Sequence, residues 1–284
     1  MRSFVHSLLV TALMLWSTLA ELRYTATLKQ DGEVVDASHI ELVPIPPSSH
    51  GKHGFYSPAI RRESNTYNDV SYSDNWCGVA HRSTPTDPVT NVFGYFTAPD
   101  LTLRPGIPAP QFAAAWIGVD GAMCNWTMLQ AGVTTVVNSN GGQSTSAWWE
   151  WYPEASYTIS GLTVKPGDWM SVNITIQDER TARVVITNAQ RGYAYTLALT
   201  SGPKLCRLDT EWILEDFYEK NEQVAFGNFK DVWFQDVAAK TAGGKTINVE
   251  GAAMVHLKNR TGTVVCRAEK YDAHNFVIWS PVNS

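Results

Sequence analysis

The sequence predicts an all-β protein in which two antiparallel sheets pack as a curved sandwich. Apolar and polar residues alternate with a period of two in several stretches, as expected of strands with one buried face. Clusters of Gly, Pro and Asn separate these stretches at intervals typical of hairpins. Extended helical periodicity is absent from the sequence, so the strands must bury their apolar faces against one another.

Two stretches show the strand pattern most clearly. In 170–176 and in 193–199, every second residue is Met, Val, Ile, Leu or Tyr, and the residues between them are polar or small. Each is predicted to be a half-buried strand. Turns are predicted at 140–142, 165–167, 190–192 and 243–244.

The chain begins with a predicted secretory signal, residues 1–20. Arg2 supplies a positive start, Leu8 to Leu19 is mostly apolar, and Ala20 ends a run suited to a signal peptidase. This apolar core is too short to cross a bilayer, and no other stretch approaches the roughly 18 apolar residues of a membrane helix. We therefore expect a secreted, extracellular protein that is not held in a membrane.

Residues 21–62 are predicted to be a removable prosegment. The stretch Pro44–Ser49, followed by Gly51 and Gly54, has the composition of a loop or linker. The dibasic pair Arg61-Arg62 precedes a polar run and resembles a processing site. A charged loop within a longer fold is the alternative interpretation. Cleavage after Arg62 would leave 63–284 as a single domain.

Charge and cysteine content narrow the possible partners. Residues 63–284 contain 16 Lys and Arg against 22 Asp and Glu, a net charge of −6 that disfavours nucleic acid. An even number of cysteines in an exported chain predicts two disulfides, with three possible pairings. No cysteine has another within four residues, so no zinc site, other metal or cofactor is expected. The cysteines are Cys77, Cys124, Cys206 and Cys266, and the glycosylation sequons begin at Asn125, Asn173 and Asn259.

Counting with a period of two assigns polar side chains to strand faces. In 148–152, Trp148, Glu150 and Tyr152 share one face, while Trp149 and Trp151 share the other. Glu150 is therefore an acid flanked by aromatic rings.

The same count applied to 209–215 places Asp209, Glu211, Ile213 and Glu215 on one face, with Trp212 and Leu214 pointing towards the core. Glu211 and Glu215 would lie about 13 Å apart along a strand, too far to act on one atom. Gln130 would share its face with Trp126 and Met128.

These residues alone leave several functions open. Glu150 and Glu211 could be the two carboxyls of a glycosidase. The tryptophans could stack on sugars in a lectin-like binding module without catalysis. Gln130 and Glu211 could instead activate a water molecule for hydrolysis. A serine peptidase is disfavoured because Gly-x-Ser-x-Gly is absent.

Several separated motifs resemble one known family, the secreted glutamic peptidases called eqolisins. They occur in the family's order and cover nearly all of 63–284: residues 75–78 (NWCG), 115–121 (AWIGVDG), 129–132 (LQAG), 148–154 (WWEWYPE) and 211–217 (EWILEDF). The resemblance implies a concanavalin-like β-sandwich and a monomeric, acid-active endopeptidase that cleaves polypeptides without a metal. Its catalytic residues would be Gln130 and Glu211.

The resemblance also implies roles for other residues. Glu211 would act as general base and then general acid, while Gln130 would hold the water and stabilise the oxyanion. It pairs Cys124 with Cys206, which leaves Cys77 with Cys266. Apart from the resemblance, the cationic end of the prosegment, which includes Arg61 and Arg62, predicts that the prosegment covers the acidic cleft as an inhibitor until it is cleaved. The expected substrate-binding or bracing residues are Trp76, Trp116, Asp120, Trp148 and Glu150.

Overall fold

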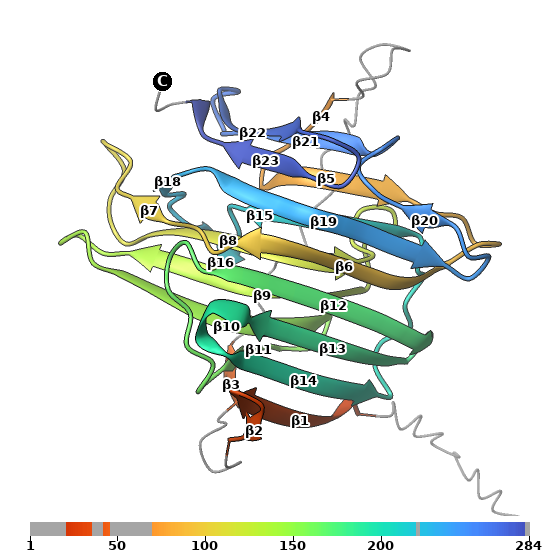
Figure 1. The fold of residues 1–284 in the computed structure, drawn as a ribbon. Coiled ribbons are helices and arrows are strands. Elements are labelled where there is room, and N and C mark those ends of the chain that lie inside the picture. The colour runs from red at the N-terminus through yellow and green to blue at the C-terminus, as the bar shows by residue number, and fades with distance from the viewer. Residues whose placement is uncertain (1–20, 36–41, 46–69, 220–221, 282–284) are drawn as a thin grey trace, which may run out of the picture.

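The computed structural model describes residues 21–35, 42–45, 70–219 and 222–281, and these form an all-β sandwich of antiparallel sheets (Figure 1). The predicted fold class is confirmed. The one helical element in the described ranges is a 3₁₀ turn, η2 (Ala189–Arg191). None of the described residues forms a helix long and apolar enough to cross a membrane.

Sheet 1 runs in the order β2–β1–β14–β13–β12–β6–β19–β23–β22, with β20 also paired to β19. The bounds of its strands are β2 (Glu33–Val34), β1 (Arg23–Gln30), β14 (Tyr193–Thr200), β13 (Thr181–Asn188), β12 (Trp169–Asp178), β6 (Val89–Thr97), β19 (Val232–Thr241), β23 (Phe276–Trp279), β22 (Val264–Lys270) and β20 (Thr246–Ile247).

Sheet 2 runs in the order β3–β11–β10–β9–β8–β15–β5–β21, and β21 also pairs with β4 and β22. Since β22 pairs with both β21 and β23, it joins the two sheets along one side. The bounds are β3 (Leu42–Ile45), β11 (Ser156–Ile159), β10 (Gln143–Tyr152), β9 (Met128–Val137), β8 (Gln111–Val119), β15 (Asp209–Glu215), β5 (Trp76–Arg82), β21 (Ala253–Lys258) and β4 (Val70–Ser73). Two small pairs remain, β7 (Leu101–Thr102) with β18 (Asn228–Phe229) and β16 (Tyr218–Glu219) with β17 (Glu222–Gln223).

The core lies between the two sheets and is built by the alternation seen in the sequence. The predicted strands at 170–176 and 193–199 are β12 and β14, and their apolar residues are buried, apart from the half-buried Tyr193. Trp149, Trp151 and Trp212 of sheet 2 belong to the same buried cluster. The opposite faces of β10 and β15 therefore point away from this core, and the candidate site lies on them.

The region from residue 21 to 45 contributes strands to both sheets (Figure 1). β1 pairs with β14 over eight residues, and Leu28 is fully buried. β3 pairs with β11, so the expected linker is wrong for Pro44 and Ile45. An outermost strand tolerates proline because the missing amide hydrogen can face away from the sheet. The predicted signal and the dibasic pair lie outside the described residues.

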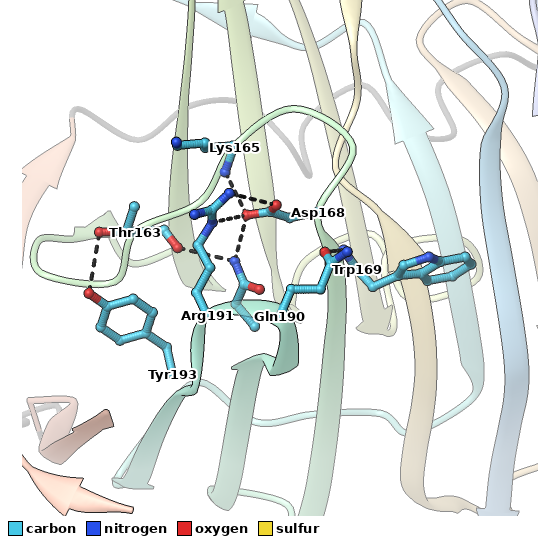
Figure 2. A network of polar contacts seen from close by, with 8 residues as sticks. Thr163, Lys165, Asp168, Trp169, Gln190, Arg191 and Tyr193 are labelled. Carbon is cyan, nitrogen blue, oxygen red and sulfur yellow. Dashed lines mark hydrogen bonds and ion pairs between the residues drawn. The ribbon is translucent and has the colours of Figure 1, made fainter. Parts of the chain in front are cut away.

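A buried carboxylate fixes the connections that lead into β12 (Figure 2). Asp168 accepts hydrogen bonds from the backbone N–H of Lys165 (2.9 Å), the amide of Asn188 (2.8 Å) and both Nε and Nη2 of Arg191 (2.5 and 3.0 Å). Burial alone would raise the pKa of Asp168, but these donors lower it below its ordinary value. The network therefore holds together the predicted turns at 165–167 and 190–192.

Candidate active site

The face of sheet 2 that points away from sheet 1 carries a second buried apolar cluster. It contains Trp76, Trp116, Met128 and Trp148, with Ile213 and Phe217 from the region of β15. Trp148 and Tyr152 lie on this face while Trp149 and Trp151 lie in the core, as the alternation predicted. Ile213 on this face and Trp212 and Leu214 in the core confirm the faces predicted for β15.

Gln130, Glu150 and Glu211 lie in one row across this face. Glu150 of β10 pairs with Gln130 of β9, Gln130 with Gly118 of β8, and Gly118 with Glu211 of β15. Directly paired residues project from the same face of a sheet. Gln130 and Glu211 are two strands apart, about 10 Å between backbones. Their side chains therefore flank the position of a residue that has none.

Gly118 is the residue that keeps this position open. A Cβ there would lie 3.1 Å from the ring of Trp116, 3.2 Å from Met128 Cε and 3.3 Å from Gln130 Cβ. These contacts are tighter than ordinary van der Waals distances, so glycine keeps the amide and the carboxyl from being crowded.

The polar atoms of the row are buried, and the side chain of Gln130 is oriented. Its Nε2 donates to Glu150 Oε2 at 2.6 Å, while its Oε1 has no hydrogen-bond partner among the described residues. Neither carboxyl oxygen of Glu211 accepts a hydrogen bond from an N–H or hydroxyl group in the described part of the chain, and the carboxyl of Asp209 is its polar neighbour. Gln130, Glu150 and Glu211 are all fully buried. Buried polar atoms without partners are uncommon and often mark functional sites.

Two further acids fix the loops beside Glu211. Asp120, at the end of β8, accepts the backbone N–H groups of Cys206, Arg207 and Leu208 at 2.8–2.9 Å. Asp209, at the start of β15, accepts those of Ala122 and Met123 at 2.8 and 3.0 Å. Each carboxylate thus binds the loop adjoining the other.

The two disulfides reinforce this framework. Cys124 joins Cys206, which links the same two loops, and Cys77 joins Cys266, which links β5 to β22. Both are the pairings that the resemblance implies. A cluster of Asp120, Cys124 and Cys206 has the spacing of metal ligands, but its two sulfurs are bonded to each other and offer no thiolate.

Electrostatics favour the protonated form of the acids around Glu211. Burial raises the pKa of Glu211 well above its ordinary value, and the nearby Asp209 and Asp120 raise it further. A proton on Glu211 can also be shared with Asp209 through a hydrogen bond between the two carboxyls. Burial and Asp209 raise the pKa of Asp120 to about 7, although three backbone amides act in the opposite sense.

The predicted aromatic residues surround the row, and Glu215 has a structural place among them. Trp76 and Trp116 pack edge to face at 5.0 Å. Glu215 accepts hydrogen bonds from Trp116 Nε1 (2.8 Å) and Asn75 Nδ2 (3.1 Å). Trp148 lies within the same cluster.

One predicted neighbour is wrong, and two contributors to the site were missed. Trp126 does not share the face of Gln130, because β9 begins at Met128 and Trp126 is 62% exposed in the preceding turn. Gly118 and Asp209 were not assigned roles. Asp209 precedes Glu211 by two residues and lies on the same face of the strand, and this placement could have identified it from the sequence.

The three sequons differ in setting. Asn125 and Asn259 are exposed, whereas Asn173 is half-buried within β12 and accepts a hydrogen bond from Asn91 at 2.6 Å.

Comparison with known proteins identifies this architecture as that of a glutamic-type endopeptidase. The fold is similar to scytalido-glutamic peptidase bound to a peptide-based transition-state analogue, with a TM-score of 0.63 at 22% identity over 73% of this chain and 98% of that one. It is also similar to aspergilloglutamic peptidase from Aspergillus niger, with a TM-score of 0.54 at 28% identity over 60% of this chain and 99% of that one.

The chain belongs to the Peptidase A4 family, which residues 74–279 match. It is 29% identical to aspergillopepsin-2 of Aspergillus niger over 205 residues, 66% of this chain and 71% of that protein. It is 31% identical to scytalidopepsin B of Scytalidium lignicola over 152 residues, 50% of this chain and 56% of that protein. The resemblance to the eqolisins is confirmed, and the glycosidase and lectin alternatives are set aside.

Proposed function

We propose that this protein is a secreted, acid-active endopeptidase in which Gln130 and Glu211 hydrolyse peptide bonds of polypeptide substrates. The observation that carries the proposal is the row in which the buried side chains of Gln130 and Glu211 flank Gly118, with Gln130 Oε1 left without a partner among the described residues. A water molecule and a scissile carbonyl could meet both side chains there.

The carboxyl of Glu211 supplies the acid–base chemistry. In its ionised form it takes a proton from the attacking water, and the oxygen of that water bonds to the carbonyl carbon. The proton then passes to the leaving amine as the C–N bond breaks, so Glu211 returns to its starting state. Because its pKa is raised, the ionised form becomes more populated as the pH rises towards that pKa.

The amide of Gln130 stabilises the charge that develops. Its Oε1 accepts a hydrogen bond from the water, and the N–H not directed at Glu150 can donate to the oxyanion of the tetrahedral intermediate. Since an amide does not titrate, this donor persists in acid. Glu150 is a positioning residue that selects the orientation of the amide.

Stability of the fold at acid pH is supported by the buried carboxyls. Burial raises the pKa values of Asp120, Asp209, Glu211 and Asp216, so all four are less easily ionised than an exposed acid. Charging several of them near neutral pH costs stability. Two disulfides support an extracellular location.

Paired variants test the proposed function. We expect Glu211→Gln to lower kcat by about 10²- to 10⁴-fold on denatured protein at acid pH, because the base is removed with little change of shape. We expect Gln130→Ala to lower kcat by about 10²- to 10³-fold. Glu154→Gln, at an exposed position, serves as the control. Retained activity in both site variants would refute the proposed roles.

We also propose that residues 21–62 are a prosegment that inhibits the enzyme before cleavage. Support comes from β3, the outermost strand of sheet 2, whose Ile45 pairs with Ser156 at the end of the row that contains Glu150. The proposed cationic end lies outside the described residues. A synthetic peptide of residues 47–62 should inhibit the mature enzyme at acid pH, and no inhibition at any pH would contradict this role.

A further inference from the structure

A cavity of about 250 Å³ lies beyond the end of β15, apart from the Gln130–Glu211 row. It is formed where the segment before β8, the segment after β15, residues 223–226 and the turn between β21 and β22 come together. Three charged residues line it: Arg104 and Asp216, each only 8% exposed, and the exposed Arg260.

Arg104 is held firmly but is not neutralised. Its backbone N–H and C=O are both bonded to the side chain of Gln111, at 2.7 and 3.1 Å. Its guanidinium lies 5.6 Å from the centre of the Phe226 ring and gives one long hydrogen bond, 3.4 Å, to the carbonyl of Gly227. The buried Nε–H has no acceptor among the described residues. Burying such a donor without a partner is costly, so an acceptor from a ligand would be favoured.

Asp216 faces the same space without pairing with Arg104. The salt bridges of the described chain do not include these two residues, and Asp216 Oδ1 has no donor there. Burial raises the pKa of Asp216 well above its ordinary value, and Glu215 and Asp74 add to this, while Arg104 and Arg260 oppose it. In acid, Asp216 is therefore a neutral O–H donor opposite a buried cation.

We propose that this cavity is a distal substrate subsite that binds a carboxylate, either from an acidic side chain or from a peptide C-terminus. The guanidinium of Arg104 and the carboxyl of Asp216 would donate to the carboxylate. Ile107, Val224 and Phe226 would contact the apolar part of the bound residue. This inference rests on the proposed peptidase function of the row.

The position of the cavity suits an extended substrate. Asp216 follows Glu211 by five residues, which is about 17 Å along a strand. Val224 packs against the apolar cluster that surrounds the row and also lines the cavity. A substrate lying along β15 would therefore bring a residue about five positions from the cleaved bond to Arg104.

Peptide pairs test the subsite at pH 5.5. Each pair carries Glu or Gln at one position, three to seven residues from the cleaved bond on either side. At one position, the wild-type protein is expected to have a kcat/KM about tenfold higher for the Glu peptide than for the Gln peptide. The difference should come from a lower KM, since charge-assisted bonds contribute to binding. A second series ends in a free carboxylate or an amide, which distinguishes the two sources.

Arg104→Met should abolish this preference, so that kcat/KM becomes equal within about twofold for the two members of each pair, because the charge-dependent binding is removed. Arg104→Lys retains the charge and is the matched control. The preference in wild type should also vanish at pH 3, below the ordinary glutamate pKa of about 4.3. This arm needs no variant, so a folding defect in Arg104→Met leaves the test intact.

Equal kcat/KM for every pair, a preference that persists at pH 3, or an equal loss on all peptides in folded Arg104→Met would each overturn the subsite. If the wild-type protein cleaves none of the peptides, the proposed function fails instead. Calorimetry with an acetylated peptide ending in glutamate then tests the cavity directly, and binding that Arg104→Met does not weaken would refute it.

Discussion

The stability of this fold should decrease as the pH rises from 4 to 7, and Asp120 should account for a measurable part of the decrease. Burial and the adjacent Asp209 raise the pKa of Asp120 from its ordinary 3.8 to about 7 in the folded protein. The folded state therefore binds this proton more tightly than the unfolded state. Its contribution is fully present below pH 3.8 and is lost as the pH rises through 7.

The magnitude follows from the two pKa values. One pKa unit corresponds to about 1.4 kcal/mol, so Asp120 should contribute a decrease of about 4 kcal/mol in the free energy of unfolding across this range. Asp209, Glu211 and Asp216 act in the same direction. His81 acts in the opposite direction, because burial lowers its pKa and the folded state binds its proton less tightly.

Asp120→Asn removes the titration of Asp120 together with its contribution to the raised pKa of Glu211, so the remaining slope should fall by at least the Asp120 share. Urea unfolding followed by tryptophan fluorescence at pH 4, 5, 6 and 7 gives the free energy of unfolding of both proteins. The variant will be less stable at pH 4, since it loses bonds to three backbone amides, but its curve should be flatter by about 4 kcal/mol over the range. Glu154→Gln should follow wild type within about 0.5 kcal/mol. Wild-type and Asp120→Asn curves separated by a constant offset would refute the reasoning.

Four other variants test the site and the residues that support it. Gly118→Ala should lower kcat by more than tenfold but reduce the free energy of unfolding, measured with urea, by only about 1–3 kcal/mol, because the added Cβ would contact side chains that can shift. Gly132→Ala should prevent folding, because its Cβ would lie 2.2 Å from a backbone oxygen. Asp209→Asn should shift the ascending limb of the pH profile of kcat/KM to lower pH, because it removes a negative charge that raises the pKa of the proposed base, and an unshifted limb would contradict that coupling. Asp168→Ala should cost about 2 kcal/mol at pH 6 and less in acid, once the pH falls below the lowered pKa of Asp168; an equal cost at pH 6 and in acid would show that its charge is not involved.

The strand faces of the site could be predicted because they depend on local alternation. Glu150 and Glu211 each lie between apolar residues whose neighbours enter the core, and that pattern is complete within a few residues of the chain. Trp126 shows the limit, because alternation does not reveal where a strand begins. Pro44 shows another, since its tolerance in β3 depends on that strand being outermost, which only the sheet as a whole determines.

The row itself could not be derived from the residues alone, because it depends on register across four strands. A shift of one residue in β8 would move Gly118 out of line with Gln130 and Glu211 and reverse every side chain on the strand. Arg104 and Asp216 are likewise brought to one cavity from positions more than 100 residues apart. Pairing and loop closure, which the amino-acid pattern does not encode locally, decide both arrangements.

The acids beside Glu211 connect the chemistry of the site to the stability of the fold. Asp120 and Asp209 bind the loops joined by the Cys124–Cys206 disulfide, and both also raise the pKa of Glu211. Moving to acid therefore protonates the framework and the proposed base together, so a stable fold and an ionised Glu211 are favoured at opposite ends of the same pH range. The working range should lie between these two limits. Asp209→Asn separates the effect on the pKa of Glu211 from the effect on stability. If the variant extends activity to lower pH while its stability in acid changes little, then the negative charge near Glu211, and not the stability of the loops, sets the lower pH limit of activity.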